Sequence, residues 1–123
     1  MVKKKKILIV DDEADILALL GARLESSGYS VFKADNGRDA IDIARDKNPD
    51  LIILDIMLPE MDGTAVNQNL KDSEVTKNIP IIFLTALQDK STESPGHMIG
   101  NNIIFAKPFD AKELMATIKK IIG

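Results

Sequence analysis

Short apolar runs alternate along this chain with stretches in which apolar residues recur every three or four positions. The runs occupy residues 7–10, 29–34, 51–54, 81–84 and 103–106. Continuous runs of this length predict strands that are buried on both faces of a parallel sheet, and the longer period predicts amphipathic helices. The alternation therefore predicts an α/β fold with one doubly wound, five-stranded parallel sheet, right-handed crossovers and five flanking helices.

Four of the five expected helices have a clear apolar stripe. Gly28 follows the first of them as a C-terminal glycine, and Asp110 precedes the last as an N-cap. The stripes comprise Ile16, Leu20 and Leu24; Ala40, Ile43 and Ala44; Val66 and Leu70; and Leu114, Ile118 and Ile121. These stripes fix one face of each helix against the sheet.

The helix expected between Thr85 and Ile103 is the weakest of the five. The sequence Ser94-Pro95-Gly96 lies where this helix should be running, and proline is tolerated only in a first helical turn. The helix either begins late, with Ser94 as its N-cap and Pro95 in its first turn, or is short and loose. We expect the highest mobility of the domain in this segment.

Composition narrows the class of protein. A length of 123 residues predicts one domain, residues 1–123, and the chain contains neither a repeat nor a linker. It has no cysteine, which excludes disulfides and thiolate metal sites and fits a reducing, cytoplasmic compartment. A formal charge of −3 argues against a nucleic-acid partner, and no segment has the length of a signal peptide or membrane span. The basic run at residues 3–6 is expected to be solvated.

Ionisable or hydroxyl side chains stand at the ends of four predicted strands. Asp11 and Asp12 end the first strand and Asp55 the third, while Thr85 and Lys107 end the fourth and fifth. All strands of a parallel sheet end on one side, so these groups should converge at the edge where open α/β folds bind their ligands. Pro59 and Asp62-Gly63 mark a tight loop after Asp55.

The chemistry of this set favours a hard cation and a phosphate. Three carboxylates held close repel one another unless a cation lies among them, and ligation by oxygen alone favours Mg²⁺. Thr85 supplies a hydroxyl, and Lys107 supplies a compact positive charge suited to phosphate oxygens. A carboxylate nucleophile, a metal, a hydroxyl and a lysine together favour phosphoryl transfer.

Each of these residues also has a purely structural interpretation. Asp11 or Asp12 could cap the following helix, Thr85 could be an ordinary strand-end residue, and Lys107 could be a surface lysine. The joint placement at one edge of the sheet is what favours a functional site.

Four motifs resemble the response-regulator receiver domain, the phosphoacceptor domain of two-component systems. They are ILIVDDE at residues 7–13, Asp55 within LDIMLPEMDG, Thr85-Ala86, and Lys107-Pro108-Phe109. The motifs extend over essentially the whole chain. Their order and spacing are similar to those of domains that resemble the chemotaxis regulator. The resemblance implies a flavodoxin-like sheet with strand order 2-1-3-4-5.

The resemblance also implies the role of each site residue. Asp55 would accept a phosphoryl group from a histidine kinase, a phosphotransfer protein or a small phosphodonor. Asp12, Asp55 and the backbone carbonyl of Met57 would ligate Mg²⁺ directly, and Asp11 would do so through water. The phosphoryl oxygens would be bound by Thr85, Lys107 and the backbone amides of Met57 and Ala86. The Lys107–Pro108 peptide bond would be cis, as the family has it.

One position departs from the family pattern. Receiver domains usually carry an aromatic residue three positions before the conserved lysine, and it changes rotamer together with the threonine. Here Ile104 occupies that switch position beside Thr85. Phe105 is a poor substitute because neighbouring strand residues point to opposite faces. The usual aromatic report of phosphorylation is therefore in question.

The sequence leaves two classes of function to compare. The first is a phospho-accepting switch, monomeric or weakly dimeric and without an output domain of its own. An effector protein would read it on the face formed by the helix expected between residues 85 and 103, the last strand and the last helix. The second is a Mg²⁺-dependent phosphohydrolase, which commonly needs an acid two residues after the nucleophile. Met57 occupies that position, which disfavours an enzyme. A receiver that no longer accepts phosphate is disfavoured because every polar site residue is present.

Overall fold

The sheet has the predicted parallel core and one further strand. The computed structural model describes residues 4–86, 97–99 and 102–123, and within them the strand order is β2-β1-β3-β4-β6-β5. Five of these strands pair in parallel. Because β6 is the last of these five along the chain, the predicted order 2-1-3-4-5 is confirmed. The strands are β1 (Lys6–Val10), β2 (Ser30–Ala34), β3 (Leu51–Asp55), β4 (Ile81–Thr85), β5 (His97–Ile99) and β6 (Asn102–Ala106).

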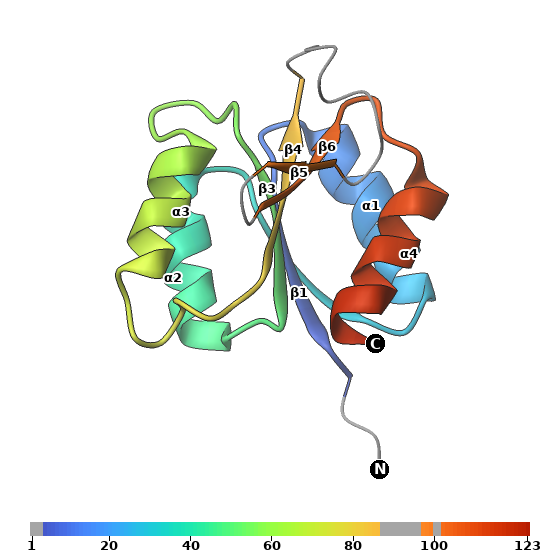
Figure 1. Ribbon diagram of the computed structural model, residues 1–123, viewed down its shortest axis with the longest axis horizontal. Helices are drawn as coiled ribbons and strands as arrows, with labels where there is room; N and C mark the ends of the chain where they lie inside the picture. The colour runs from blue at the N-terminus through green and yellow to red at the C-terminus, as the bar shows by residue number, and fades with distance from the viewer. Residues whose placement is uncertain (1–3, 87–96, 100–101) are drawn as a thin grey trace.

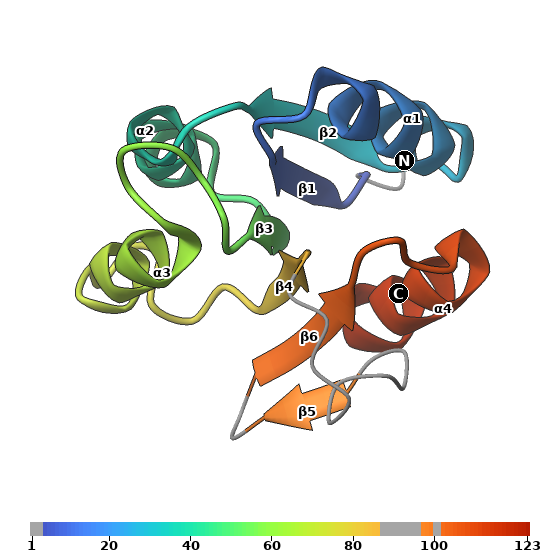
Figure 2. The ribbon, with the colours of Figure 1, turned by 90° about the horizontal axis from the view of Figure 1, so that it is seen from above.

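Helices cover both faces of this sheet. Figure 1 and the perpendicular view of Figure 2 show α2 and α3 on one face, with α1 and α4 on the other. The helices are α1 (Ala14–Ser26), α2 (Gly37–Lys47), α3 (Gly63–Lys71) and α4 (Ala111–Ile122). All four lie where the apolar stripes predict them. None of the helices in the described part of the chain is long and apolar enough to cross a membrane.

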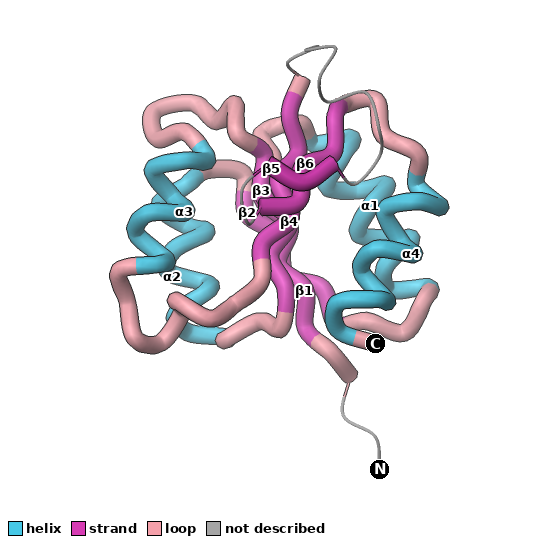
Figure 3. Tube along the Cα trace, in the orientation of Figure 1, coloured by secondary structure: helices cyan, strands magenta, loops and turns pink. Residues whose placement is uncertain are grey.

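Alternation along the strands divides the core into two clusters, one on each face of the sheet. Leu8 and Val10 of β1 join the cluster beneath α2 and α3, whereas Ile7 and Ile9 join the cluster beneath α1 and α4. All four side chains are buried because β1 lies between β2 and β3. The strands form the middle layer of a three-layer molecule (Figure 3), so the ends of its strands are held firmly.

Short polar side chains fix the starts of three helices. Asn36 accepts a hydrogen bond from the backbone N–H of Asp39 at α2, and Asp62 does the same for Ala65 at α3. Asp110 accepts from two backbone N–H groups of α4, which confirms its predicted role as an N-cap. At the other end of α1, Gly28 has φ +98°, the left-handed conformation that glycine adopts after a helix.

The expected fifth flanking helix is the one correction to the fold. Four helices occur in the described residues, and His97–Ile99, where a helix beginning at Pro95 would run, is instead the strand β5. It pairs antiparallel with β6, from His97↔Ile104 to Ile99↔Asn102. The pairing with β6 supplies hydrogen-bond partners for an extended strand here, and tertiary pairing of this kind overrides local propensity. The mobility expected around Ser94 concerns residues outside those described.

Candidate functional site

The carboxyl ends of the parallel strands bring the predicted polar residues to one edge of the sheet. Asp11 and Asp12 directly follow β1, and Asp55 is the last residue of β3. Thr85 ends β4, and its carbonyl accepts a hydrogen bond of 2.7 Å from the backbone N–H of Lys107, just after β6. The strand pairing thus places residues far apart in the sequence beside one another, as predicted.

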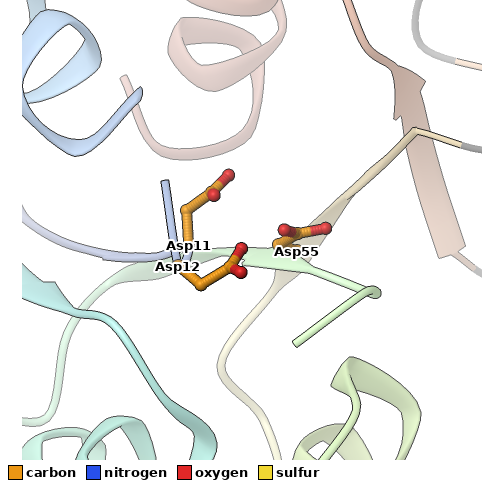
Figure 4. Close-up of side chains that lie close together, drawn as sticks. All are labelled: Asp11, Asp12 and Asp55. Atoms are coloured by element: carbon orange, nitrogen blue, oxygen red, sulfur yellow. The ribbon is translucent and has the colours of Figure 1, made fainter. Parts of the chain in front are cut away.

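Three carboxylates form the acidic centre of this edge. One oxygen from each of Asp11, Asp12 and Asp55 lies within 4.8 Å of the others, and the three side chains are close together in Figure 4. Asp11 and Asp55 are buried, with 0% and 2% of their surface exposed, while Asp12 is exposed. Two desolvated carboxylates this close need a compensating positive charge.

Lys107 provides a positive charge to this centre. Its Nζ lies 2.7 Å from Asp11 Oδ2 and 3.3 Å from Asp55 Oδ2, and its side chain is only 12% exposed. The contact with Asp11 is an ion pair. The contact with Asp55 is also a hydrogen bond. A lysine in this position can neutralise the acids and is within reach of any group bound to Asp55.

Glu13 is a contact of Lys107 that the sequence interpretation missed. Its Oε2 lies 3.2 Å from Lys107 Nζ, and the glutamate itself is exposed. The sequence signal was present, because Glu13 is the third acid of the run after β1. Its backbone N–H also donates to Asp11 Oδ1 at 2.9 Å. Asp11 therefore holds the start of α1, although Glu13 and not Asp11 or Asp12 is the N-cap residue of that helix.

Burial and charge act in opposite directions on the two central groups. Burial raises the pKa of Asp55, and the nearby charge of Asp11 adds to this, against the hydrogen bond from Met57 and the charge of Lys107. Burial alone would lower the pKa of Lys107, but the contacts with Asp11, Asp55 and Glu13 raise it well above its ordinary value. The lysine is therefore firmly protonated. The ionised form of Asp55, by contrast, is less stable here than it would be in water.

The loop after Asp55 is drawn tightly back against the strand end. Asp55 Oδ1 accepts a 3.1 Å hydrogen bond from the backbone N–H of Met57, and the Ile56 carbonyl accepts one of 2.8 Å from Gly63. A Cβ on Gly63 would meet the Asp55 carbonyl oxygen at 2.5 Å. Met57 itself is 54% exposed. The glycine lets α3 begin directly beside the acidic centre.

The remaining predicted residues lie on β4 and β6. Thr85 is buried, and Ala86 follows it at the same edge. Ile104 is partly buried against the cluster beneath α2 and α3, whereas Phe105 is buried in the opposite cluster, as the alternation along a strand predicts. The Lys107–Pro108 peptide bond is cis.

The donor set fits a hard divalent cation. It offers carboxylate oxygens from three residues, and Mg²⁺ favours oxygen ligands with one or two carboxylates supplied by the protein. Asp12 is exposed and can be reached from solvent, while the buried oxygens of Asp11 and Asp55 supply the negative field. The family model of the response regulator receiver domain matches residues 7–119.

This chain belongs to the response regulator receiver domain family. It is 41% identical over 118 residues to the phosphate regulon transcriptional regulatory protein PhoB of Pseudomonas aeruginosa, covering 96% of this chain and 52% of that protein. It is likewise 41% identical over 120 residues to a probable transcriptional regulator, ycf27, of Porphyridium aerugineum, covering 98% of this chain and 49% of that protein. The chain thus spans about half the length of the curated relatives it matches.

Solved receiver domains share the fold closely. The chemotaxis response regulator CheY4 of Vibrio cholerae has a TM-score of 0.83 at 28% identity, with 98% of this chain and 100% of that chain covered. The receiver domain of the sensor histidine kinase PA1611 of P. aeruginosa has a TM-score of 0.81 at 31% identity, with 98% and 99% covered. The latter has a magnesium ion coordinated in its active-site cleft. The resemblance seen in the sequence is confirmed, and a receiver domain is a signalling switch of two-component systems.

Proposed function

We propose that this receiver domain is a phospho-accepting switch in which Asp55 is the acceptor. The observation that supports this role most is the position of its buried carboxylate, beside Asp11 and Asp12 and 3.3 Å from a lysine. An Asp55 oxygen attacks the phosphorus of a phosphohistidine on a histidine kinase or phosphotransfer protein. The new O–P bond forms as the P–N bond breaks, and the electron pair leaves with the imidazole, which takes up a proton.

The carboxylate cluster is proposed to hold Mg²⁺ for this transfer. Asp12, Asp55 and the Met57 carbonyl would be direct ligands, with Asp11 acting through water. When bound, the cation supplies neutralisation of charge on the phosphoryl oxygens. The exposure of Asp12 supports this assignment, because a metal exchanged with solvent needs an accessible ligand.

Three further groups are proposed to bind the phosphoryl oxygens. They are the Thr85 hydroxyl at the end of the neighbouring strand and the backbone amides of Ala86, the next residue, and of Met57, which already donates to Asp55 Oδ1. Lys107 already contacts Asp55, so a small movement of its ammonium would follow the new negative charge. These contacts differ between the two phosphorylation states and so can drive a conformational change.

The change is proposed to be read by an effector protein on the face that includes β6 and α4. The helix expected beside this face is replaced over His97–Ile99 by β5, so that part of the surface differs from the one expected from the sequence. Ile104 is β-branched and stiff at χ1, and it packs against the core beneath α2 and α3. In this proposal, the side chains of Ile104 and Thr85 repack together on phosphorylation. This repacking replaces the rotamer change of an aromatic residue in other receiver domains.

The number of turnovers distinguishes the switch from a phosphohydrolase. The chain is incubated with Mg²⁺ and an excess of acetyl phosphate or of a phosphomonoester, and released phosphate is measured per chain. We expect the phosphomonoester to be left intact, because Met57 cannot act as the acid–base group of a hydrolase. Sustained release of phosphate from the phosphomonoester, abolished by Asp55→Asn, would assign the site to an enzyme instead.

A further inference from the structure

A groove lies at the edge of the sheet opposite Asp55. It has a volume of about 770 Å³ and is formed by the residues before β1, the turn between α1 and β2, and one side of α4. The start of β1 and the end of α4 meet at the bottom of Figure 1, far from the strand ends that carry the acidic centre. One five-residue strand, about 17 Å long, separates the two edges. The groove is thus independent of the phosphoacceptor site.

The groove combines an apolar floor with a basic rim. The floor contains Tyr29, Met115 and Ile122, which contact the core cluster beneath α1 and α4. The rim carries Lys4, Lys5 and Lys119, all exposed, and none of the lining side chains in the described part of the chain is acidic. The remaining lining residues are Ser27, Gly28, Ala116 and Gly123. The protein has a net charge of −3, so the three lysines around this apolar groove make the local charge opposite in sign to that of the whole chain.

Compensation of helix dipoles does not account for this rim. Lys119 lies in the last turn of α4, where a lysine is favourable in any helix. Lys4 and Lys5, however, precede a strand and belong to no helix. By contrast, their neighbour Lys6 is half-buried and donates a 2.9 Å hydrogen bond to the Lys47 carbonyl. Among the residues that the structure describes, Lys4 and Lys5 form no ion pair, yet both border the groove.

We propose that this groove binds an acidic segment of a partner protein that also carries apolar side chains. Its volume lies in the range of roughly 300–1,000 Å³ typical of ligand sites. The apolar floor accepts a leucine-sized side chain, and the rim pairs with flanking carboxylates. A nucleic acid fits less well because Tyr29, the one aromatic residue among the described residues of the lining, is buried and cannot serve as a stacking platform. A membrane surface fits less well because the apolar residues line a concavity and do not protrude.

The test is direct binding of a defined peptide. A short fluorescein-labelled peptide of alternating glutamate and leucine is titrated with the whole chain, and fluorescence anisotropy is followed. We expect saturable binding that weakens as salt is added, because exposed charge pairs are screened. Two matched peptides, one with lysine for glutamate and one with serine for leucine, should bind at least about tenfold more weakly, equivalent to 1.4 kcal/mol.

Variants of the chain locate the binding. Lys119→Glu and Lys5→Glu should each weaken the peptide about three- to tenfold, a loss that reflects removal of an attraction and creation of a repulsion. Lys112→Glu is the matched control, because it makes the same charge change on α4 at an exposed position that does not line the groove. Ala116→Trp, at an exposed lining position, should reduce binding by filling the groove without changing its charge. Thermal unfolding of each variant checks that the fold is intact.

The outcomes separate this proposal from its alternatives and from the phosphorylation proposal. Asp55→Asn should bind the peptide as the parent does, since that residue lies at the other edge. Absence of saturable peptide binding would overturn the proposal, as would an equal loss in Lys112→Glu and Lys119→Glu. Binding of phosphatidylserine vesicles or of single-stranded DNA through Lys5 and Lys119, more tightly than the peptide, would assign the groove to that other class of partner and overturn ours.

Discussion

At the scale of single residues, the site is a set of charges that would not be stable in isolation. Asp11 and Asp55 are buried carboxylates, and Lys107 contacts both of them. Structural ion pairs are usually arranged so that each charge is matched, whereas here one cation faces three acids when Glu13 is included. A divalent cation can neutralise this surplus of negative charge. Phosphorylation can also change which of the acids Lys107 contacts.

The raised pKa of Asp55 predicts a pH-dependent cost to stability. A carboxyl group whose pKa is raised on folding stabilises the folded state below its ordinary value of 3.8, and this contribution is lost as the pH rises through the folded pKa. Without Mg²⁺, Asp55→Asn should therefore raise the free energy of unfolding at neutral pH, because the buried negative charge is removed. Denaturant unfolding at a series of pH values measures this.

The gain from Asp55→Asn should shrink as the pH falls toward 3.8, because the parent residue is then protonated too. Asp42→Asn, an exposed carboxylate of α2, is the control and should give no comparable gain. A loss of stability in Asp55→Asn at neutral pH would mean that the contact with Lys107 outweighs the burial of the carboxylate.

Lys107→Ala should destabilise the protein in a way that Mg²⁺ reverses. The lysine is 12% exposed and contacts three carboxylates, so its removal leaves Asp11 and Asp55 without their cation. We expect a loss of roughly 2 kcal/mol, less than for a fully buried pair because the site borders solvent. Millimolar Mg²⁺ should restore most of it, since a ligand that binds only the folded state stabilises that state.

The control for Lys107→Ala is the same variant with Asp12→Ala added. This double variant should not be rescued by Mg²⁺, because a proposed direct ligand is gone. Thermal unfolding with and without the ion gives both comparisons. Equal rescue of the two variants would place the cation away from the carboxylate cluster.

At the scale of elements, the position of the phosphoacceptor loop depends on how closely α3 approaches the end of β3. Gly63 and Gly37 both occupy the first position of a helix, after Asp62 and Asn36 respectively. A Cβ on Gly63 would meet the backbone of Asp55 and Ile56 at 2.5 and 2.7 Å. A Cβ on Gly37 would meet the side chains of Val66 and Met61, at distances from 2.7 Å.

Gly63→Ala should be the more damaging of these two matched substitutions. Backbone atoms cannot yield without moving the acceptor, whereas the atoms that crowd Gly37 are ends of the Val66 and Met61 side chains, which can shift. We expect Gly63→Ala to cost about 2–3 kcal/mol and to slow phosphorylation, and Gly37→Ala to cost about 1 kcal/mol with phosphorylation retained. Urea unfolding and single-turnover phosphotransfer measure the two effects. Comparable damage from both would show that the loop after Asp55 is not the sensitive contact.

Some of the strands could be predicted from the sequence and one could not. The strands β1, β3 and β4 are predicted well because residues buried on both faces of a sheet leave an unbroken apolar run. The segment between Thr85 and Ile103 has no such run, and its proline and glycine weaken a helix without specifying a strand. Pairing with β6 decides the conformation of His97–Ile99, and tertiary pairing of this kind has no local signal.

At the scale of the whole molecule, most of the candidate site follows from the topology. Once the sheet is parallel, Asp11, Asp55, Thr85 and Lys107 must lie at one edge, so the sequence order alone predicts their convergence. The side-chain contacts do not follow in the same way. Glu13 belongs to the acidic run after β1, but the run does not specify which of its three acids contact Lys107, a detail that the folded geometry decides.

The central claim is that Asp55 accepts a phosphoryl group. The most direct measurement is mass spectrometry of the intact chain after incubation with acetyl phosphate and Mg²⁺, followed by reduction with labelled borohydride to mark the acyl phosphate. We predict one added phosphoryl group, placed at Asp55, that is lost in Asp55→Asn and when Mg²⁺ is chelated. Labelling that persists in Asp55→Asn, or that falls on another residue, would contradict the account.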